Sequence, residues 1–218
     1  MVVFHIKDIS LRVLAFLTGI LIASTVMATE EPKFTVIEKS EPFELRTYAP
    51  QLVAEVKVEG DLDVASSQGF RLIAAFIFGQ NQVSEKISMT VPVGIEATQS
   101  TKIAMTVPVG IEASKDSATG VNQWVFSFVM PSEYTMATLP KPLNPLVTIR
   151  ELPAQRRAAI TFSGFYNEAK VLEKTRALEE WIKSKQWQAT GSPQFARYNP
   201  PWSIPFMRRN EILIPVRD

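Results

Sequence analysis

The chain has 218 residues, of which 46% are hydrophobic and 21% charged, and its formal net charge is +1 at pH 7. This length and composition predict a globular chain that can bury a sizeable core. The near balance of charge gives no reason to expect nucleic acid or an anionic membrane as a partner.

The first 28 residues have the pattern of an export signal. Lys7 and Arg12 precede an apolar run over residues 13–28, which is followed by an acidic segment. The pattern predicts a secretory signal peptide that is cleaved after Ala28, and a periplasmic or secreted mature chain without membrane contact. The alternative is an uncleaved anchor, although the run is shorter than the roughly 20 residues that span a bilayer.

The rest of the chain, residues 29–218, is expected to form one domain and contains neither histidine nor cysteine, because the only histidine is His5. These residues therefore exclude disulfides, catalysis that needs a Ser–His or Cys–His pair, and metal sites that need imidazole or thiolate. There is no glycine-rich phosphate loop, and no acid–base pair stands out. The sequence predicts a protein that is not an enzyme and leaves only carboxylate-based catalysis open.

Strand patterns dominate the first part of this domain. Residues 34–60 predict two or three short strands, since Leu52 and Ala54 belong to an apolar series that alternates with charged residues. Residues 124–131 are aromatic and β-prone, whereas the three prolines of residues 139–145 predict an irregular connection.

A helix is predicted between the strands, over residues 61–79. Asp61 or Asp63 would cap its start, and Gly79 would close it. Gly69 lies in its interior, where glycine is about 1 kcal/mol less favourable than alanine. This glycine therefore indicates a close packing contact.

The second half follows the same order of elements. Residues 146–152 and 156–164 predict strands, residues 167–187 an amphipathic helix, and residues 194–198 and 210–216 two closing strands. Strand–strand–helix–strand–strand, given twice, predicts an α+β fold with pseudo-twofold symmetry. We expect a curled antiparallel sheet or distorted barrel with two helices.

A repeated phrase occupies residues 86–97 and 102–113, with eleven of twelve positions identical. If each copy forms a strand, alternate residues share a face, and the spacing of sixteen keeps both apolar faces on the same side when the copies pair. The predicted faces are Ile87, Met89, Val91 and Val93 in the first copy, and Ile103, Met105, Val107 and Val109 in the second.

Within the first copy, Pro92 predicts an edge or bulge and Gly94 the start of a turn. The two methionines, Met89 and Met105, either fill irregular space in the core or line a ligand groove. Periodicity alone favours the core.

Five segments together resemble the SOUL haem-binding protein family: "FGQNQVSEKISMTVPV", "WVFSFVMPSEY", "LPKP", "FSGF" and "YNPPWSIPFMRRNEILIPV". They are spread over residues 34–216. The resemblance implies a distorted barrel or curled sheet with two helices that binds haem or a related tetrapyrrole in a shallow apolar groove, without chemistry of its own. The fold is also similar to bacterial effector-binding domains that hold small hydrophobic molecules.

Haem is thus the candidate cofactor, bound without histidine or cysteine ligation, and no metal ligand is assigned. The chain departs from the family pattern where Ser67 and Ala75 stand in place of Arg and Lys in some members, and Ser203 near an expected Lys. The candidate ligand-binding residues are Phe70, Arg71, Met89, Met105, Tyr198, Trp202, Met207, Arg208 and Arg209.

The candidate cations would grip carboxylates of the ligand, because a guanidinium forms two parallel hydrogen bonds with a carboxylate. For Arg208 and Arg209 the alternative is a structural pairing with acids such as Glu211. Tyr48 and Tyr198 are candidate oxygen ligands, or else half-buried strand residues.

Two other functions stay open: binding of a different amphipathic small molecule, and a protein-interaction module whose groove receives a partner's helix or strand. We expect a monomer.

Overall fold

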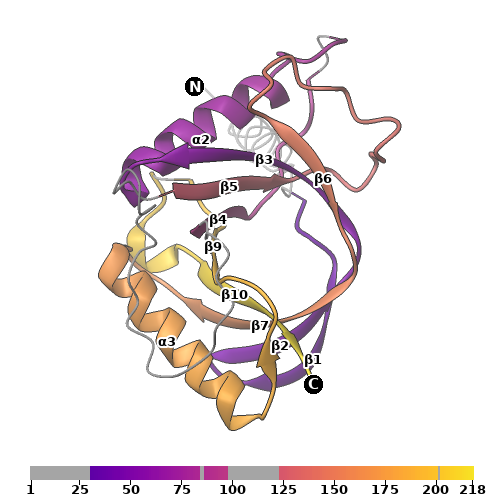
Figure 1. Ribbon diagram of the computed structural model, residues 1–218. Coiled ribbons are helices and arrows are strands. Elements are labelled where there is room, and N and C mark those ends of the chain that lie inside the picture. Colours follow the sequence, from indigo (N-terminus) through magenta and orange to yellow (C-terminus); the bar gives the residue numbers. More distant parts are fainter. Residues whose placement is uncertain (1–29, 84–85, 98–122, 201) are drawn as a thin grey trace, which may run out of the picture.

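The computed structural model of the protein describes residues 30–83, 86–97, 123–200 and 202–218. The expected signal peptide over residues 1–28 and the second copy of the repeated phrase, with Met105, lie outside the described residues. The elements, shown in Figure 1, are β1 (Phe34–Ser40), β2 (Phe43–Tyr48), β3 (Gln51–Glu59), α2 (Leu62–Ile77), β4 (Val93–Ala97), β5 (Gln123–Val129), β6 (Thr148–Leu152), β7 (Gln155–Phe162), α3 (Glu168–Ser184), β8 (Gln188–Ala189), β9 (Gln194–Arg197), the 3-10 turn η1 (Pro205–Met207) and β10 (Asn210–Arg217).

All the strands of the described residues belong to one antiparallel sheet of ten strands. Its order is β1-β2-β7-β10-β9-β4-β5-β3-β6, and the short β8 pairs with β10. The sheet curls but leaves β1 and β6 as free edges, so it is not a closed barrel (Figure 1). This confirms the α+β curled sheet predicted from the sequence.

The strand order confirms the predicted pseudo-twofold symmetry. If β2 is exchanged with β6, β3 with β7, β4 with β9 and β5 with β10, the same strand order results, read in the opposite direction. The two equivalent units are therefore β2-β3-α2-β4-β5 and β6-β7-α3-β9-β10, and they meet where β4 pairs with β9. Each unit gives its first strand to the other half of the sheet.

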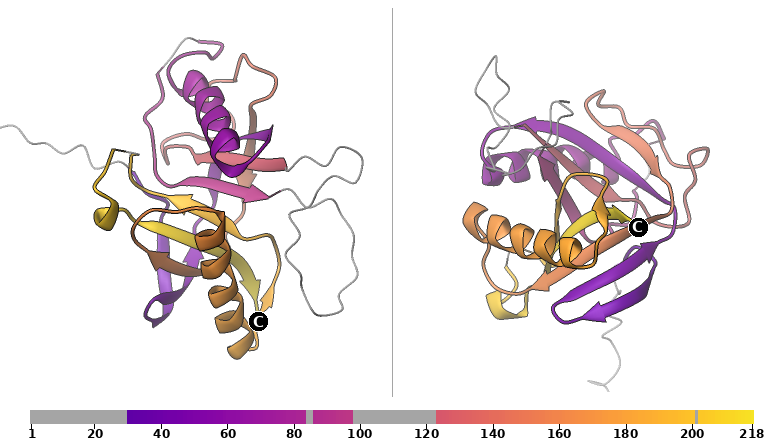
Figure 2. Two further views of the ribbon diagram at one scale, coloured as in Figure 1. Left: turned by 90° about the vertical axis from the view of Figure 1, so that its left-hand side faces the viewer. Right: turned by 60° about the horizontal axis from the view of Figure 1, so that its bottom comes forward.

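Both helices cover the same face of the sheet (Figure 2). Helix α2 packs on β3 and β5, and α3 packs on β7 and β10. The carboxylate of Asp61 caps α2 by accepting a hydrogen bond from Val64 N at 2.8 Å, and the Asn167 side chain caps α3 by accepting one from Lys170 N at 2.8 Å. Between helices and sheet lies one apolar core, which includes Ile95 of β4.

The opposite face of the sheet is turned inward and is more polar. Because side chains alternate along a strand, Leu45 points to the α3 core while Arg46 points to this inner face. Side chains from strands in both halves of the sheet line one small cavity there. The inner face thus holds most of the buried charge.

The strand predicted for the start of the repeated phrase is wrong. Residues 86–92 form no strand, and β4 begins only at Val93, directly after a cis peptide bond between Val91 and Pro92. The segment is fixed instead by its backbone and by buried polar groups: Ile87 N donates to Ile77 O at 2.8 Å, and the Thr90 hydroxyl donates to Val129 O.

The predicted turn at Gly94 is also wrong, and Pro92 lies outside the strands, directly before β4, rather than at a strand edge or a bulge. Gly94 lies inside β4, where it pairs with Ser127 of β5 and Ala196 of β9. A Cβ at this position would lie 2.7 Å from the Ser127 hydroxyl and closer still to the Gln194 amide. Only glycine fits here, because side chains from both neighbouring strands occupy the space that a Cβ would need.

Candidate functional site

A buried ion pair joins β2 and β10 on the inner face of the sheet. Arg46 donates from its two terminal nitrogens to the two carboxylate oxygens of Glu211 at 2.8 and 3.1 Å, and these residues are only 4% and 2% exposed. The hydroxyls of Tyr198 and Thr161 also donate to Glu211, at 2.7 and 3.2 Å. Four donors occupy this carboxylate, so it fixes the sheet and is not a free base or ligand.

The two candidate tyrosines belong to this network. The Tyr48 hydroxyl accepts a hydrogen bond from Arg46 at 3.1 Å, and the Tyr198 hydroxyl is committed to Glu211. Burial raises the pKa of both tyrosines, so their hydroxyls stay protonated at neutral pH. Neither hydroxyl points to an external ligand.

Arg209 lies on the edge of the same network. Its guanidinium is 3.4 Å from the centre of the Tyr198 ring, pairs with Glu31, and places Nε 3.8 Å from Glu211. These contacts favour the structural role for Arg209 over a role in gripping a ligand.

The inner-face cavity has a volume of about 20 Å³ and is bordered by Ser127, Arg157 and Gln194 among others. Arg157 is buried and donates to the Gln194 amide oxygen at 2.6 Å. A space of this size holds about one water molecule, because one water needs at least about 10–15 Å³ measured in this way. The cavity is too small for a ligand.

Glu96 on the inner face gives a prediction about pH. Burial raises its pKa, although Arg157 and Arg150 oppose the rise. A carboxyl group whose pKa is higher in the folded than in the unfolded state stabilises the fold when it is protonated. This contribution is complete below the pKa of the unfolded state and is lost as the pH rises through the pKa of the folded state. Glu96→Gln should therefore be more stable than the wild type at pH 7, with the difference shrinking toward pH 4. Urea unfolding at both pH values checks this, and a difference that grows in acid would contradict it.

Two loops present a cluster of exposed apolar side chains, which we call the loop patch. Phe165 follows β7, and Trp202, Ile204, Phe206 and Met207 lie in and before η1; all five are between 53% and 84% exposed. Side chains of this size rarely gather on the surface of a soluble protein unless they bind something.

Backbone and side-chain contacts tie the two loops of the patch together. Gly164 N donates to Pro205 O at 3.0 Å, and the Asn210 amide donates to Gly164 O at 3.2 Å. The Arg208 guanidinium lies 5.1 Å from the centre of the Phe165 ring and donates to Ser203 O at 2.9 Å. A cation thus borders an apolar platform of fixed shape.

The structure divides the remaining predicted site residues among separate places. Trp202, Met207 and Arg208 belong to the loop patch, whereas Phe70 and Arg71 are exposed on α2. The Phe70 ring lies 5.8 Å from that of Phe128, at the edge of the core. Met89 is half-buried against the core, as expected for a packing role.

Sequence reasoning missed Phe165, Ile204 and Phe206. All three lie in motifs that carried the family resemblance, "FSGF" and "WSIPFMRR", but periodicity alone could not separate exposed aromatics in a loop from buried ones in a strand. The one available signal of a loop was the prolines at both ends of "PPWSIP", because proline lacks the N–H that a strand needs for its hydrogen bonds.

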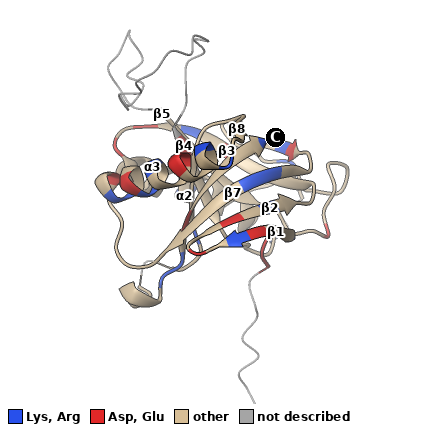
Figure 3. Cartoon of the chain, turned by 90° about the horizontal axis from the view of Figure 1, so that it is seen from below, with Lys and Arg blue, Asp and Glu red and all other residues tan. Residues whose placement is uncertain are grey.

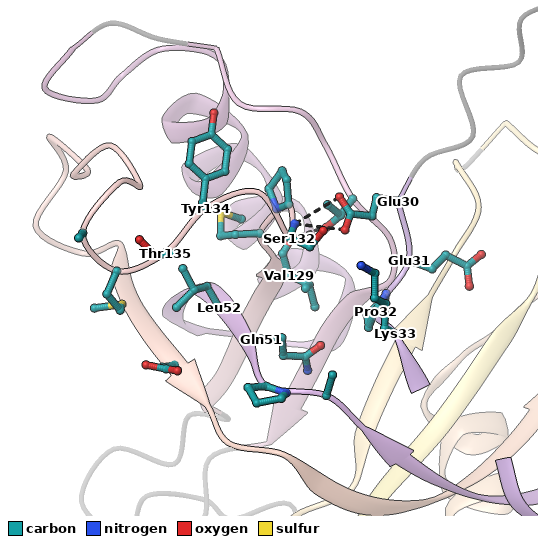
Figure 4. Close-up of a pocket in the computed structure, with 18 residues that line it drawn as sticks. Glu30, Glu31, Pro32, Lys33, Gln51, Leu52, Val129, Ser132, Tyr134 and Thr135 are labelled. Atoms are coloured by element: carbon teal, nitrogen blue, oxygen red, sulfur yellow. Dashed lines mark hydrogen bonds between the residues drawn. The ribbon is translucent and has the colours of Figure 1, made fainter. Parts of the chain in front are cut away.

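A larger cavity of about 450 Å³ opens where β3 begins and β5 ends, as Figure 4 shows. It is bounded by the segment 30–33, the corner 49–52 between β2 and β3, and the segment 129–137, with Thr90 and Glu151 completing it. No sequence pattern predicted this cavity, because its walls come from segments far apart in the chain.

Charge on the described surface is mixed. Lysines, arginines and acids are interspersed along α3 and on β1 and β2 (Figure 3). Within the described residues, no group of three or more His, Cys, Asp or Glu side chains could hold a metal ion. No helix in that part of the chain is long and apolar enough to cross a membrane.

Solved structures with the same fold include the C-terminal domain of EcmrR, with a TM-score of 0.57 at 11% identity over 81% of this chain and 97% of that one. A protein from Listeria innocua described as a hydrolase gives a TM-score of 0.53 at 8% identity, over 83% of this chain and 94% of that one. At these identities the likeness concerns the fold alone. A search of curated proteins found no match.

The family comparison covers nearly the whole domain. The model of the SOUL heme-binding protein family matches residues 29–215, which include both helices and every strand except the last two residues of β10. The chain therefore belongs to the SOUL haem-binding protein family.

Proposed function

We propose that the protein binds haem or a related tetrapyrrole on the loop patch, as a monomer in the periplasm or outside the cell, and that it catalyses no reaction. The observation that carries the proposal is the loop patch itself: five large apolar side chains, each more than half exposed, on two loops that are tied together. Membership of a haem-binding family supports the choice of ligand.

The chemistry of the patch suits an amphipathic planar ring. Trp202 and Phe206 would cover an apolar face, and Arg208 would attract the carboxylates at the edge of the ring. Met207 supplies a thioether, the one soft donor among the patch residues, since residues 29–218 contain no His or Cys. Iron would thus be held weakly or not at all, and packing would provide most of the affinity.

Titration of the purified protein with hemin tests the proposal. We expect a Soret band that shifts and saturates near one equivalent. The double variant Trp202→Ala, Phe206→Ala should weaken binding about tenfold or more, because aromatic anchors carry much of the free energy of such contacts. Met207→Leu keeps the apolar area, so it should change the spectrum more than the affinity if sulfur contacts the iron.

The matched control is Phe78→Ala, which removes an exposed aromatic ring at the end of α2, outside the patch. It should bind hemin like the wild type. Free protoporphyrin should bind with similar affinity if packing dominates. Absence of a saturable Soret change, or equal weakening by the control and the patch variants, would refute binding at the patch.

A further inference from the structure

We infer that the 450 Å³ cavity at the start of β3 is a second ligand site, and that it takes a small apolar amine in its cationic form. This goes beyond tetrapyrrole binding, because the cavity and the loop patch share no residue. We call the cavity the β3–β5 pocket.

The pocket has the size and walls of a small-molecule site. Pockets that hold small ligands usually measure about 300–1,000 Å³ and are lined mainly by apolar groups with a few polar ones. Leu52, Val129 and Met130 form part of its apolar wall, and Met136 is an exposed, adaptable side chain at its border. Figure 4 shows Leu52 and Val129 facing the hollow from β3 and β5.

The backbone around the pocket is held in place. Glu30 accepts hydrogen bonds from Ser132 N at 3.1 and 3.3 Å, which fixes the segment 30–33 to the far wall. Val91 N donates to Glu30 O at 3.1 Å, and Met130 N donates to Leu52 O at 2.8 Å. The pocket is thus preformed by contacts between four separate segments.

Charge decides which ligand the pocket favours. Glu31 is paired with Arg209, so its charge is compensated. No cation in the described part of the chain forms an ion pair with Glu30 or Glu151, and Lys33 is the single lysine or arginine that lines the pocket. Two uncompensated carboxylates against one ammonium leave the pocket negative, which attracts a cation and repels an anion.

The balance of charge also distinguishes the ligand preference of this pocket from that of the loop patch. A tetrapyrrole with two carboxylates would meet net negative charge here, whereas Arg208 borders the patch. An amine with an apolar body would place its ammonium at Glu151 and its body on the apolar wall. The two sites therefore favour ligands of opposite charge.

Two molecules with the same phenylbutyl body test the inference: 4-phenylbutylamine, a cation at pH 7, and 5-phenylpentanoate, an anion. Each is titrated into ¹⁵N-labelled protein and followed by amide chemical shifts. We expect the amine to bind saturably with a dissociation constant of about 1 mM or tighter, as suits a ligand of about a dozen heavy atoms. The shifts should map to residues 49–52 and 129–137, and the anion should bind at least about fivefold more weakly.

Variants assign the charge effect to the pocket. Glu151→Gln should weaken amine binding about threefold to fivefold, the effect of one partly exposed charge, and should reduce the difference between the two ligands. Glu133→Gln is the matched control, because this exposed acid lies two residues from Pro131 but does not line the pocket. It should leave both affinities unchanged, and 0.5 M salt should reduce the preference for the amine.

The test separates this inference from tetrapyrrole binding. The Trp202→Ala, Phe206→Ala variant should bind the amine normally, and Glu151→Gln should bind hemin normally. Equal affinity for amine and anion, shifts that map elsewhere, or no effect of Glu151→Gln would overturn the inference. Displacement of the amine by hemin would show a single shared site and would also overturn it.

Discussion

Replacing Arg46 by methionine should lower the free energy of unfolding by about 3–5 kcal/mol, the largest effect we expect from one substitution. The change leaves Glu211 only 2% exposed and without the cation that donates to both its oxygens. An uncompensated buried charge is far more costly than the ion pair is stabilising. Urea unfolding followed by tryptophan fluorescence measures the loss.

A second variant identifies the cause. The double variant Arg46→Met, Glu211→Leu should recover much of the stability, since apolar replacement of both partners removes the need for pairing. A loss below about 1 kcal/mol, or a double variant less stable than Arg46→Met, would contradict this account.

Gly69→Ala should destabilise the protein by about 1–3 kcal/mol, opposite in sign to helix propensity. In an exposed helix the same change stabilises by about 1 kcal/mol. Here a Cβ would lie 2.5 Å from Cβ and 2.8 Å from Cδ1 of Phe126, a fully buried ring that cannot move without disturbing the core. Overpacking of this kind costs about 1–3 kcal/mol.

Two variants complete the test of the glycine. Ser67→Ala on the exposed side of α2 should change stability by less than about 0.5 kcal/mol. Phe126→Leu should be less harmful in the Gly69→Ala background than in the wild type, because the smaller side chain makes room for the new methyl group. A stabilised Gly69→Ala protein would show that α2 can shift away from β5.

The elements of this fold could be predicted from the sequence because each carries a local signal. The alternation at Leu52 and Ala54, the cap at Asp61 and the interior Gly69 all described what the structure contains. The order of these signals, given twice, was enough to predict two equivalent halves. Local chemistry and global topology agree throughout these segments.

Segment 86–92 could not be predicted, because its apolar periodicity imitates a strand. The backbone of Ile87 is hydrogen-bonded to the end of α2, and the Thr90 hydroxyl to the end of β5. Partners distant in the sequence therefore determine the conformation of this segment. Gly94 was misplaced for a related reason. A glycine is needed at this position because Ser127 and Gln194 occupy the space of a side chain, and no local sequence pattern reveals these contacts.

The candidate site was predicted only in part. The motifs pointed to Trp202, Met207 and Arg208, which do meet in the loop patch. The alternation of β2 did not show that Arg46 faces a closed interior, because a polar residue on a strand usually faces water. The curvature that buries it depends on the whole sheet.

The exchange of first strands between the two halves has a consequence for how the chain reaches this structure. Strand β2 pairs on one side with β1, its neighbour in the sequence, but its partner on the other side is β7, so Leu45 must wait for Ala158, more than a hundred residues further along. A chain that grows from its amino end therefore makes β2 well before its second partner strand. Such long-range pairing slows folding, and neither half-chain can complete its own part of the sheet alone.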